Sequence, residues 1–201
     1  MDKQDIIDFF DRMAPSWDTN LIHDDEKIGV ILDYAGITKG LNVLDVACGT
    51  GVLIPDYLAR GVKKVTAVDI SPKMIEIARS KFSDPRVQFL NADIETLDFS
   101  EAFDRCVVYN AFPHFPDPRN LIRSLADRLI QGGRLTVAHS MSREAINAHH
   151  DGIASKVSIE LMSESELSVI FGGCFDVDTA LSTAAMYVVS GIKKHLDKKT
   201  E

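Results

Sequence analysis

The stretch "VLDVACGTG", residues 43–51, joins an apolar run to a turn made almost entirely of small residues. The apolar residues predict a short buried strand over 41–47, and residues 52–60 are expected to form the helix that follows it. Gly49 and Gly51 let the main chain come close to another molecule, because a glycine has no side chain to obstruct the approach. The amides that open the next helix favour a negative group. This turn is therefore the first candidate for a ligand-binding loop.

The same alternation of strand and helix continues along the chain. Ser71 and Pro72 are typical of a helix start, and Ser163 with Glu166 has the spacing of a capping box. Further strands are predicted over 64–70, 87–93, 103–110 and 134–140, and helices over 2–13, 24–35, 72–82, 117–130 and 164–171.

Two strands joined by a short connection, 175–181 and 184–192, are expected to pair antiparallel at the end of the chain. The predicted fold class is therefore α/β, a Rossmann-like doubly wound, seven-stranded and mostly parallel sheet with a C-terminal antiparallel hairpin. Residues 1–201 are interpreted as a single domain, since no linker or internal repeat divides them.

Composition limits the classes of partner. The chain has 201 residues, a formal net charge of −8 and 45% hydrophobic residues, which favours a globular domain and disfavours nucleic acid or an anionic membrane as partner. No apolar run approaches the roughly 20 residues of a membrane span, and Cys48, Cys106 and Cys174 form neither a disulfide framework nor a CxxC site. We expect a cytoplasmic protein, a monomer or homodimer, with a basic tail over 193–201.

Acidic residues end the second and third predicted strands. In "AVDIS" Asp69 lies at the end of strand two, where a carboxylate can accept hydrogen bonds from both hydroxyls of a ribose. In "NADIE" Asp93 follows strand three and can accept from an adenine amino group. Ile70, Met74 and Ile94 would be apolar neighbours of that ring. A dinucleotide fits badly, because a G-x-G-x-x-G motif that starts at Gly49 would need glycine where Ile54 stands.

Taken in order, "VLDVACGTG", "AVDIS", "NADIE" and "FDRCVVYNAF" resemble the nucleotide-site motifs of class I S-adenosylmethionine-dependent methyltransferases, especially the small-molecule branch with the ubiquinone and menaquinone C-methyltransferases. The resemblance covers roughly residues 5–140. It implies S-adenosylmethionine as cofactor, S-adenosylhomocysteine as product and a small-molecule methyl acceptor. Ala47 stands where the family often has glycine.

The resemblance also assigns roles to single residues. Asp45 and the loop Ala47, Cys48, Gly49 and Gly51 would hold the methionine part, Asp69 the ribose, Asp93 with Ile94 the adenine, and Asn110 would lie beside the sulfonium. "FFDRMAPSWD" (9–18) is similar to the family's cofactor-covering segment, so residues 1–36 are expected to form a helical lid that contains Phe10 and Trp17.

Four histidines are expected near the acceptor. His114 follows the strand 103–110 and His139 ends the strand 134–140; because these strands are predicted neighbours, both rings should reach one rim. His149 and His150 lie in 140–172, an expected acceptor-side lid. On a helix, adjacent residues point about 100° apart, so one of this pair at most faces the cleft.

Three interpretations of these histidines stay open. They act as a base or orienting group for a phenol, enol or thiol; they bind a metal together with Asp117 or Asp151; or they are polar residues of solvated loops. Their spacing fits no standard metal motif, and no metal ligand is predicted. A noncatalytic S-adenosylmethionine-binding protein, a metal-dependent methyltransferase and a nicotinamide-dependent oxidoreductase remain alternatives.

Overall fold

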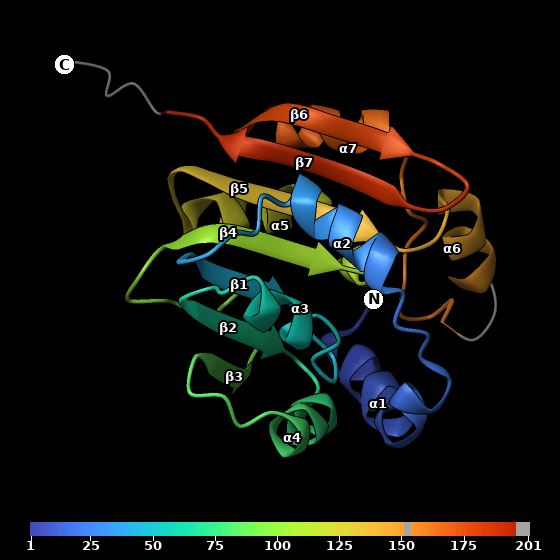
Figure 1. The fold of residues 1–201 in the computed structure, drawn as a ribbon. Coiled ribbons are helices and arrows are strands. Elements are labelled where there is room, and N and C mark those ends of the chain that lie inside the picture. The colour runs from blue at the N-terminus through green and yellow to red at the C-terminus, as the bar shows by residue number, and fades with distance from the viewer. Residues whose placement is uncertain (151–153, 196–201) are drawn as a thin grey trace.

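A sheet with the strand order β3-β2-β1-β4-β5-β7-β6 runs through the computed structural model, which describes residues 1–150 and 154–195 (Figure 1). Five strands are parallel, and β7 pairs antiparallel with both β5 and β6. The strands are β1 (Asn42–Val46), β2 (Lys64–Asp69), β3 (Val87–Asn91), β4 (Phe103–Tyr109), β5 (Leu129–His139), β6 (Phe175–Ser182) and β7 (Tyr187–Lys193). The predicted fold class, including the C-terminal hairpin, is confirmed.

Helices cover both faces of the sheet. Apolar residues of α2, α3 and α4 pack on one face, and those of α5, α6 and α7 pack on the other (Figure 1). The helices are α1 (Lys3–Met13), α2 (Asp25–Tyr34), α3 (Ile54–Ala59), α4 (Pro72–Lys81), α5 (Pro118–Asp127), α6 (Arg143–His150) and α7 (Glu164–Phe171), with 3-10 turns at Ala14–Asn20 (η1) and Phe112–His114 (η2). α1 lies at the end of the sheet toward which β1, β2 and β4 point.

Capping groups place helix starts where the sequence predicts them. The Ser71 hydroxyl accepts from the Met74 amide, and Ser163 and Glu166 form the predicted capping box. Other bounds shift by a few residues, and two departures from the prediction have an identifiable cause. After the predicted helix ends at Met13, the chain continues in helical geometry through Pro15 as η1, because a proline in the first turn has no amide that needs a partner.

The second difference is at the start of β5. The predicted helix over 117–130 ends at Asp127, and the strand begins at Leu129 instead of Arg134. Leu129 pairs with Phe103 of β4 and is buried, so ladder pairing and burial outweigh the local preference for helix. A register shift follows within this pair of strands, and Gly132 has a positive φ of 72°.

Gly51 is required by packing beneath the turn. Its φ is +85°, and an added Cβ would stand 2.9 Å from Cε2 of Phe82. Gly40 has a similar φ of +87°, but nothing lies within 4 Å of an added Cβ there. A substitution at Gly40 therefore introduces backbone strain alone, whereas one at Gly51 introduces backbone strain and steric overlap.

We expect Gly51→Ala to lower the free energy of unfolding more than Gly40→Ala. Both variants force alanine into a left-handed conformation at a cost of about 1 kcal/mol, and Gly51→Ala adds an overlap worth about 1–3 kcal/mol. Urea unfolding of the two variants beside the unchanged protein measures the difference. Equal losses in the two variants would contradict the packing role of Gly51.

Candidate functional site

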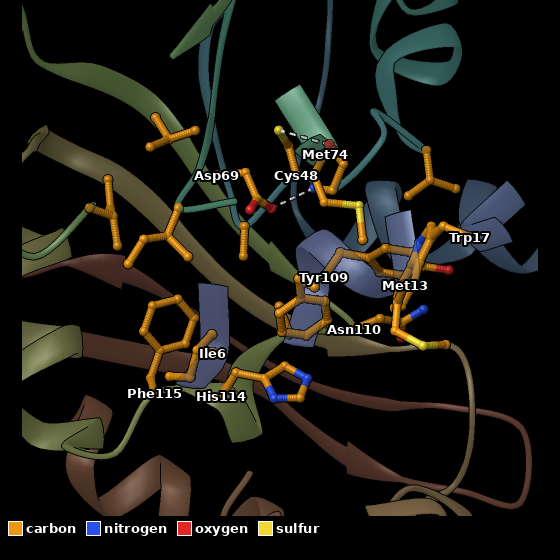
Figure 2. Close-up of a pocket in the computed structure, with 18 of the residues that line it drawn as sticks. Ile6, Met13, Trp17, Cys48, Asp69, Met74, Tyr109, Asn110, His114 and Phe115 are labelled. Carbon is orange, nitrogen blue, oxygen red and sulfur yellow. Dashed lines mark hydrogen bonds between the residues drawn. The ribbon is translucent and has the colours of Figure 1, made fainter. Parts of the chain in front are cut away.

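A cavity of about 630 Å³ opens at the carboxyl ends of β1, β2 and β4, under α1 and η1 (Figure 2). The sheet order reverses direction here, since β2 and β4 lie on either side of β1. This is where open α/β sheets bind ligands, because the loops on either side of the reversal diverge and leave a crevice.

The turn after β1 presents main chain to this cavity. Ala47 and Gly49 both have positive φ, 54° and 55°. An added Cβ on Gly49 would meet nothing closer than Nε1 of Trp17 at 3.9 Å, so the space above this glycine is open toward the cavity. Ala47, Cys48 and Gly49 line the cavity, whereas Gly51 packs under the turn against Phe82.

Asp69, at the end of β2, links this turn to the next loop. Its Oδ2 accepts from the Gly49 amide at 2.8 Å and its Oδ1 accepts from the Ser71 amide at 2.9 Å. The side chain lines the cavity although the residue is only 8% exposed. Burial raises the pKa of Asp69 to about 6, and the two amide hydrogen bonds oppose that rise.

Asp45, the residue before the last of β1, is buried more deeply than Asp69. It is 2% exposed and is not among the residues that line the cavity. Burial raises the pKa of its carboxyl to about 8, and the nearby Asp69 carboxylate adds to the rise. Asp45 therefore supports the turn from below instead of facing a ligand.

Asp93, which follows β3, lines the cavity together with Ile70, Met74 and Ile94, as the sequence predicts for an adenine pocket. Its Oδ2 accepts from Nζ of Lys3 at 2.5 Å, and the same ammonium lies 3.0 Å from Oε2 of Glu95. Sequence reasoning missed Lys3 and Glu95. Nothing in the local pattern around residue 3 signals a partner 90 positions away in the chain.

The N-terminal segment is held over the cavity by polar contacts along its length. Besides Lys3, the Ser71 hydroxyl donates to Asp11 at 2.6 Å. Further along, Asp18 accepts from the Thr50 hydroxyl at 2.6 Å and from Nζ of Lys81 at 2.7 Å. The predicted lid residues Phe10 and Trp17 both line the cavity, with ring centroids 5.7 Å apart.

Asn110 lines the cavity directly after the end of β4. It has a positive φ of 53°, its Oδ1 accepts from the Ser140 amide at 2.9 Å, and its Nδ2 donates to the Ser140 hydroxyl at 3.1 Å. The two side-chain contacts tie the end of β4 to the end of β5. A non-glycine residue in this backbone region is uncommon and concentrates at functional sites.

The four histidines are not brought to one rim. His114 and His149 line the cavity, and Figure 2 shows His114 on the same side as Tyr109 and Asn110. His139 does not line it, contrary to the expectation. Its position in β5 turns its ring into the core, with 1% exposure and a centroid 6.0 Å from that of Tyr187.

The side chain of His150 and the whole of Asp151 lie outside the described residues, as does the tail beyond residue 195. Within residues 1–150 and 154–195, the group with metal-ligand spacing is His23, Asp25 and Asp56, which includes none of the four histidines expected near the acceptor. In the same ranges, no helix combines the length and apolarity that a bilayer crossing requires.

Comparison with known proteins gives the class. Residues 43–133 match the family model described as a methyltransferase domain. The chain is 31% identical over 138 residues to the malonyl-[acyl-carrier protein] O-methyltransferase of Acetivibrio thermocellus, an alignment that covers 67% of this chain and 49% of that one. It is 37% identical over 100 residues to the ubiquinone biosynthesis O-methyltransferase of Xanthomonas axonopodis pv. citri, covering 48% of this chain and 41% of that one.

Solved structures agree at the level of the fold. The magnesium protoporphyrin IX methyltransferase of Synechocystis PCC 6803 with bound S-adenosylhomocysteine aligns with a TM-score of 0.74 at 18% identity, covering 96% of this chain and 100% of that chain. A methyltransferase bound to the Trm112 activator of Haloferax volcanii aligns with a TM-score of 0.74 at 19% identity, covering 92% of this chain and 98% of that chain.

The chain is thus a homologue of S-adenosylmethionine-dependent methyltransferases, and residues 43–133 are the part that matches the methyltransferase-domain model. It spans about half the length of the two curated relatives described above. The family resemblance drawn from the motifs is confirmed.

The buried carboxyl of Asp45 makes stability depend on pH. Because its pKa in the folded protein, about 8, lies above the ordinary 3.8, its contribution to stability is fully present below about pH 4 and is lost as the pH rises through 8. We expect Asp45→Asn to remove this loss, so that its stability relative to the unchanged protein improves by up to about 1.4 kcal/mol per pH unit between pH 5 and 8.

Urea unfolding of both proteins at pH 5, 6.5 and 8 measures the trend. Asp69 has its own raised pKa and is present in both, so it cancels to first order. Parallel stability profiles would contradict the assignment of a raised pKa to Asp45.

Proposed function

We propose that this protein transfers a methyl group from S-adenosylmethionine to a small-molecule acceptor and releases S-adenosylhomocysteine. The observation that carries the proposal is the joint placement of the open main chain at Gly49 and the Asp69 carboxylate in one cavity at the reversal of the sheet. The cavity volume of about 630 Å³ lies within the range of small-molecule sites, about 300–1,000 Å³.

The polar and apolar groups that line the cavity fit an adenosine with a short charged tail. A carboxylate has about four acceptor positions, and Asp69 uses one on each oxygen for a main-chain amide. The remaining positions match the two hydroxyl donors of a ribose. We assign the adenine to Ile70, Met74 and Ile94 with Asp93, and the methionine part to the Ala47–Gly49 turn, with Asp45 and Gly51 shaping that turn.

The chain's own contribution to the reaction is positioning. S-adenosylmethionine supplies an already activated methyl group when it is bound. The lid residues Phe10 and Trp17 exclude water from that end of the cavity, and Asn110 holds the ends of β4 and β5 together beside it. The part of the cavity beyond β4 and β5, where His114 and His149 lie, supports an enzyme over a protein that only binds the cofactor.

Binding of S-adenosylhomocysteine tests this function through Trp17, the single tryptophan of the chain. Because Trp17 lines the cavity, we expect binding to change its fluorescence and to raise the melting temperature. Asp69→Asn, which keeps the shape but loses the charge, is expected to weaken binding at least ~10-fold, since that corresponds to about 1.4 kcal/mol. Asp176→Asn, at an exposed acid of β6, is the matched control and should bind normally.

Two outcomes would contradict separate parts of the proposal. Absence of any response to S-adenosylhomocysteine, or an equal response to a nicotinamide dinucleotide, would remove the function. Unchanged affinity in Asp69→Asn would remove the ribose assignment and leave the function in place.

A further inference from the structure

One tautomer of His114 is selected by its surroundings. Its Nδ1 lies 2.7 Å from the main-chain oxygen of Val157. A carbonyl oxygen only accepts hydrogen bonds, so Nδ1 carries the proton and donates it. In the neutral ring the basic lone pair is then on Nε2. Val157 is buried and lies in the segment that follows α6, so the contact joins the η2 turn to the acceptor-side lid.

The His114 ring is also contacted by Phe10 of the N-terminal lid. The centroid of Phe10 lies 4.8 Å from that of His114, with the rings at 82°. The edge-to-face contact and the Val157 hydrogen bond fix both the position and the orientation of the imidazole. Figure 2 shows the ring near Tyr109, the last residue of β4, with Asp69 on the opposite side of Tyr109 in this view.

Charge is unevenly distributed along the cavity. Among the described lining residues, Lys3 is the single lysine or arginine, and its ammonium contacts Asp93 and Glu95 at the adenine end. Lys27 lies close to the other end, but its Nζ donates to the Ser140 oxygen and lies 3.5 Å from Asp24. An anionic acceptor would therefore lose its hydration without gaining a lysine or arginine partner from the lining.

The walls at the acceptor end are largely apolar. Met13, Leu21, Ile22 and Met141 line the cavity, and Ile22 is 88% exposed at its mouth. Large apolar side chains left this exposed around a cavity are typical of a site that takes an apolar molecule.

Resting on the proposed function, we propose that the methyl acceptor is an uncharged, planar and apolar molecule with a weakly acidic hydroxyl, a phenol or an enol, and that Nε2 of His114 accepts the hydroxyl proton. As the hydroxyl oxygen bonds to the methyl carbon, the carbon–sulfur bond breaks and its electron pair stays on sulfur. The O–H proton passes to Nε2. The products are a neutral methyl ether, a neutral thioether and an imidazolium that returns its proton to solvent.

The first test is binding, which needs no turnover. Protein saturated with S-adenosylhomocysteine is titrated calorimetrically with 2-naphthol and 2-naphthoate, which share one ring system. We expect 2-naphthol to bind at least ~10-fold more tightly than 2-naphthoate, because the carboxylate must be desolvated without a lysine or arginine partner. Equal or tighter binding of 2-naphthoate, or no binding of 2-naphthol, overturns the acceptor class while the cofactor response still supports the proposed function.

The second test is the tautomer. Long-range proton–nitrogen correlation spectra of ¹⁵N-histidine-labelled protein assign each ring, with His114→Asn identifying the His114 signals. We expect the neutral His114 ring to carry its proton on Nδ1. A proton on Nε2 overturns the base role.

The third test is the pH profile of methylation, with 2-naphthol as probe. His114→Asn retains a donor for the Val157 oxygen but has no base, so kcat is expected to fall by ~10²–10⁴ with little change in KM. The acidic limb of the kcat profile should disappear in the variant. His195→Gln, at an exposed position outside the cavity, is the control.

Other ionisable groups also line this cavity. The comparison of the kcat–pH profiles of the unchanged protein and His114→Asn distinguishes their titration from that of His114. At the nucleoside end they are Lys3, Asp69, Asp93 and Glu95, with the buried Cys48, and at the acceptor end Tyr109 and His149. An acidic limb that survives in His114→Asn assigns it to one of these groups and overturns the role of His114.

Discussion

The hydrogen bonds from the Gly49 and Ser71 amides to the Asp69 carboxylate hold the functional end of this molecule together. They join the turn after β1 to the start of α4, two segments that parallel strands bring side by side but do not connect. Burial raises the pKa of Asp69 to about 6, so the same burial that shields these bonds also disfavours the charge that strengthens them. Donors that fill the carboxylate's remaining acceptor positions would relieve that conflict.

The N-terminal lid is joined to the rest of the protein by side-chain contacts. Lys3, Asp11 and Asp18 contact Asp93, Ser71 and Thr50, residues that all lie at the carboxyl edge of the sheet. These contacts are polar and partly solvated, whereas the core on either face of the sheet is apolar. The same segment also packs through Ile6, which is buried in a small apolar cluster with Ala154 and Val157, so its attachment combines exposed polar contacts with apolar burial.

Much of the cofactor end could be predicted from the sequence. Glycines, strand-terminal acids and capping residues are local features, and each acts through a backbone requirement that its neighbours in sequence reveal: open main chain at Gly49, a strand end at Asp69, a helix start at Ser71. The acceptor end was less predictable. His139 is buried because its side chain lies on a face of β5 that packs into the core. The start of β5 at Leu129 instead of Arg134 follows from the pairing of Leu129 with β4.

The sequence by itself determined the alternation of elements, the open turn and the acids at the ends of the second and third strands, because strand periodicity and turn chemistry act over a few residues. Only the tertiary structure decided that Lys3 meets Asp93, that Phe82 is the reason for glycine at position 51, and that the Val157 oxygen selects the tautomer of His114. Those contacts join residues far apart in the chain, and their geometry follows from packing of the whole sheet and its lid.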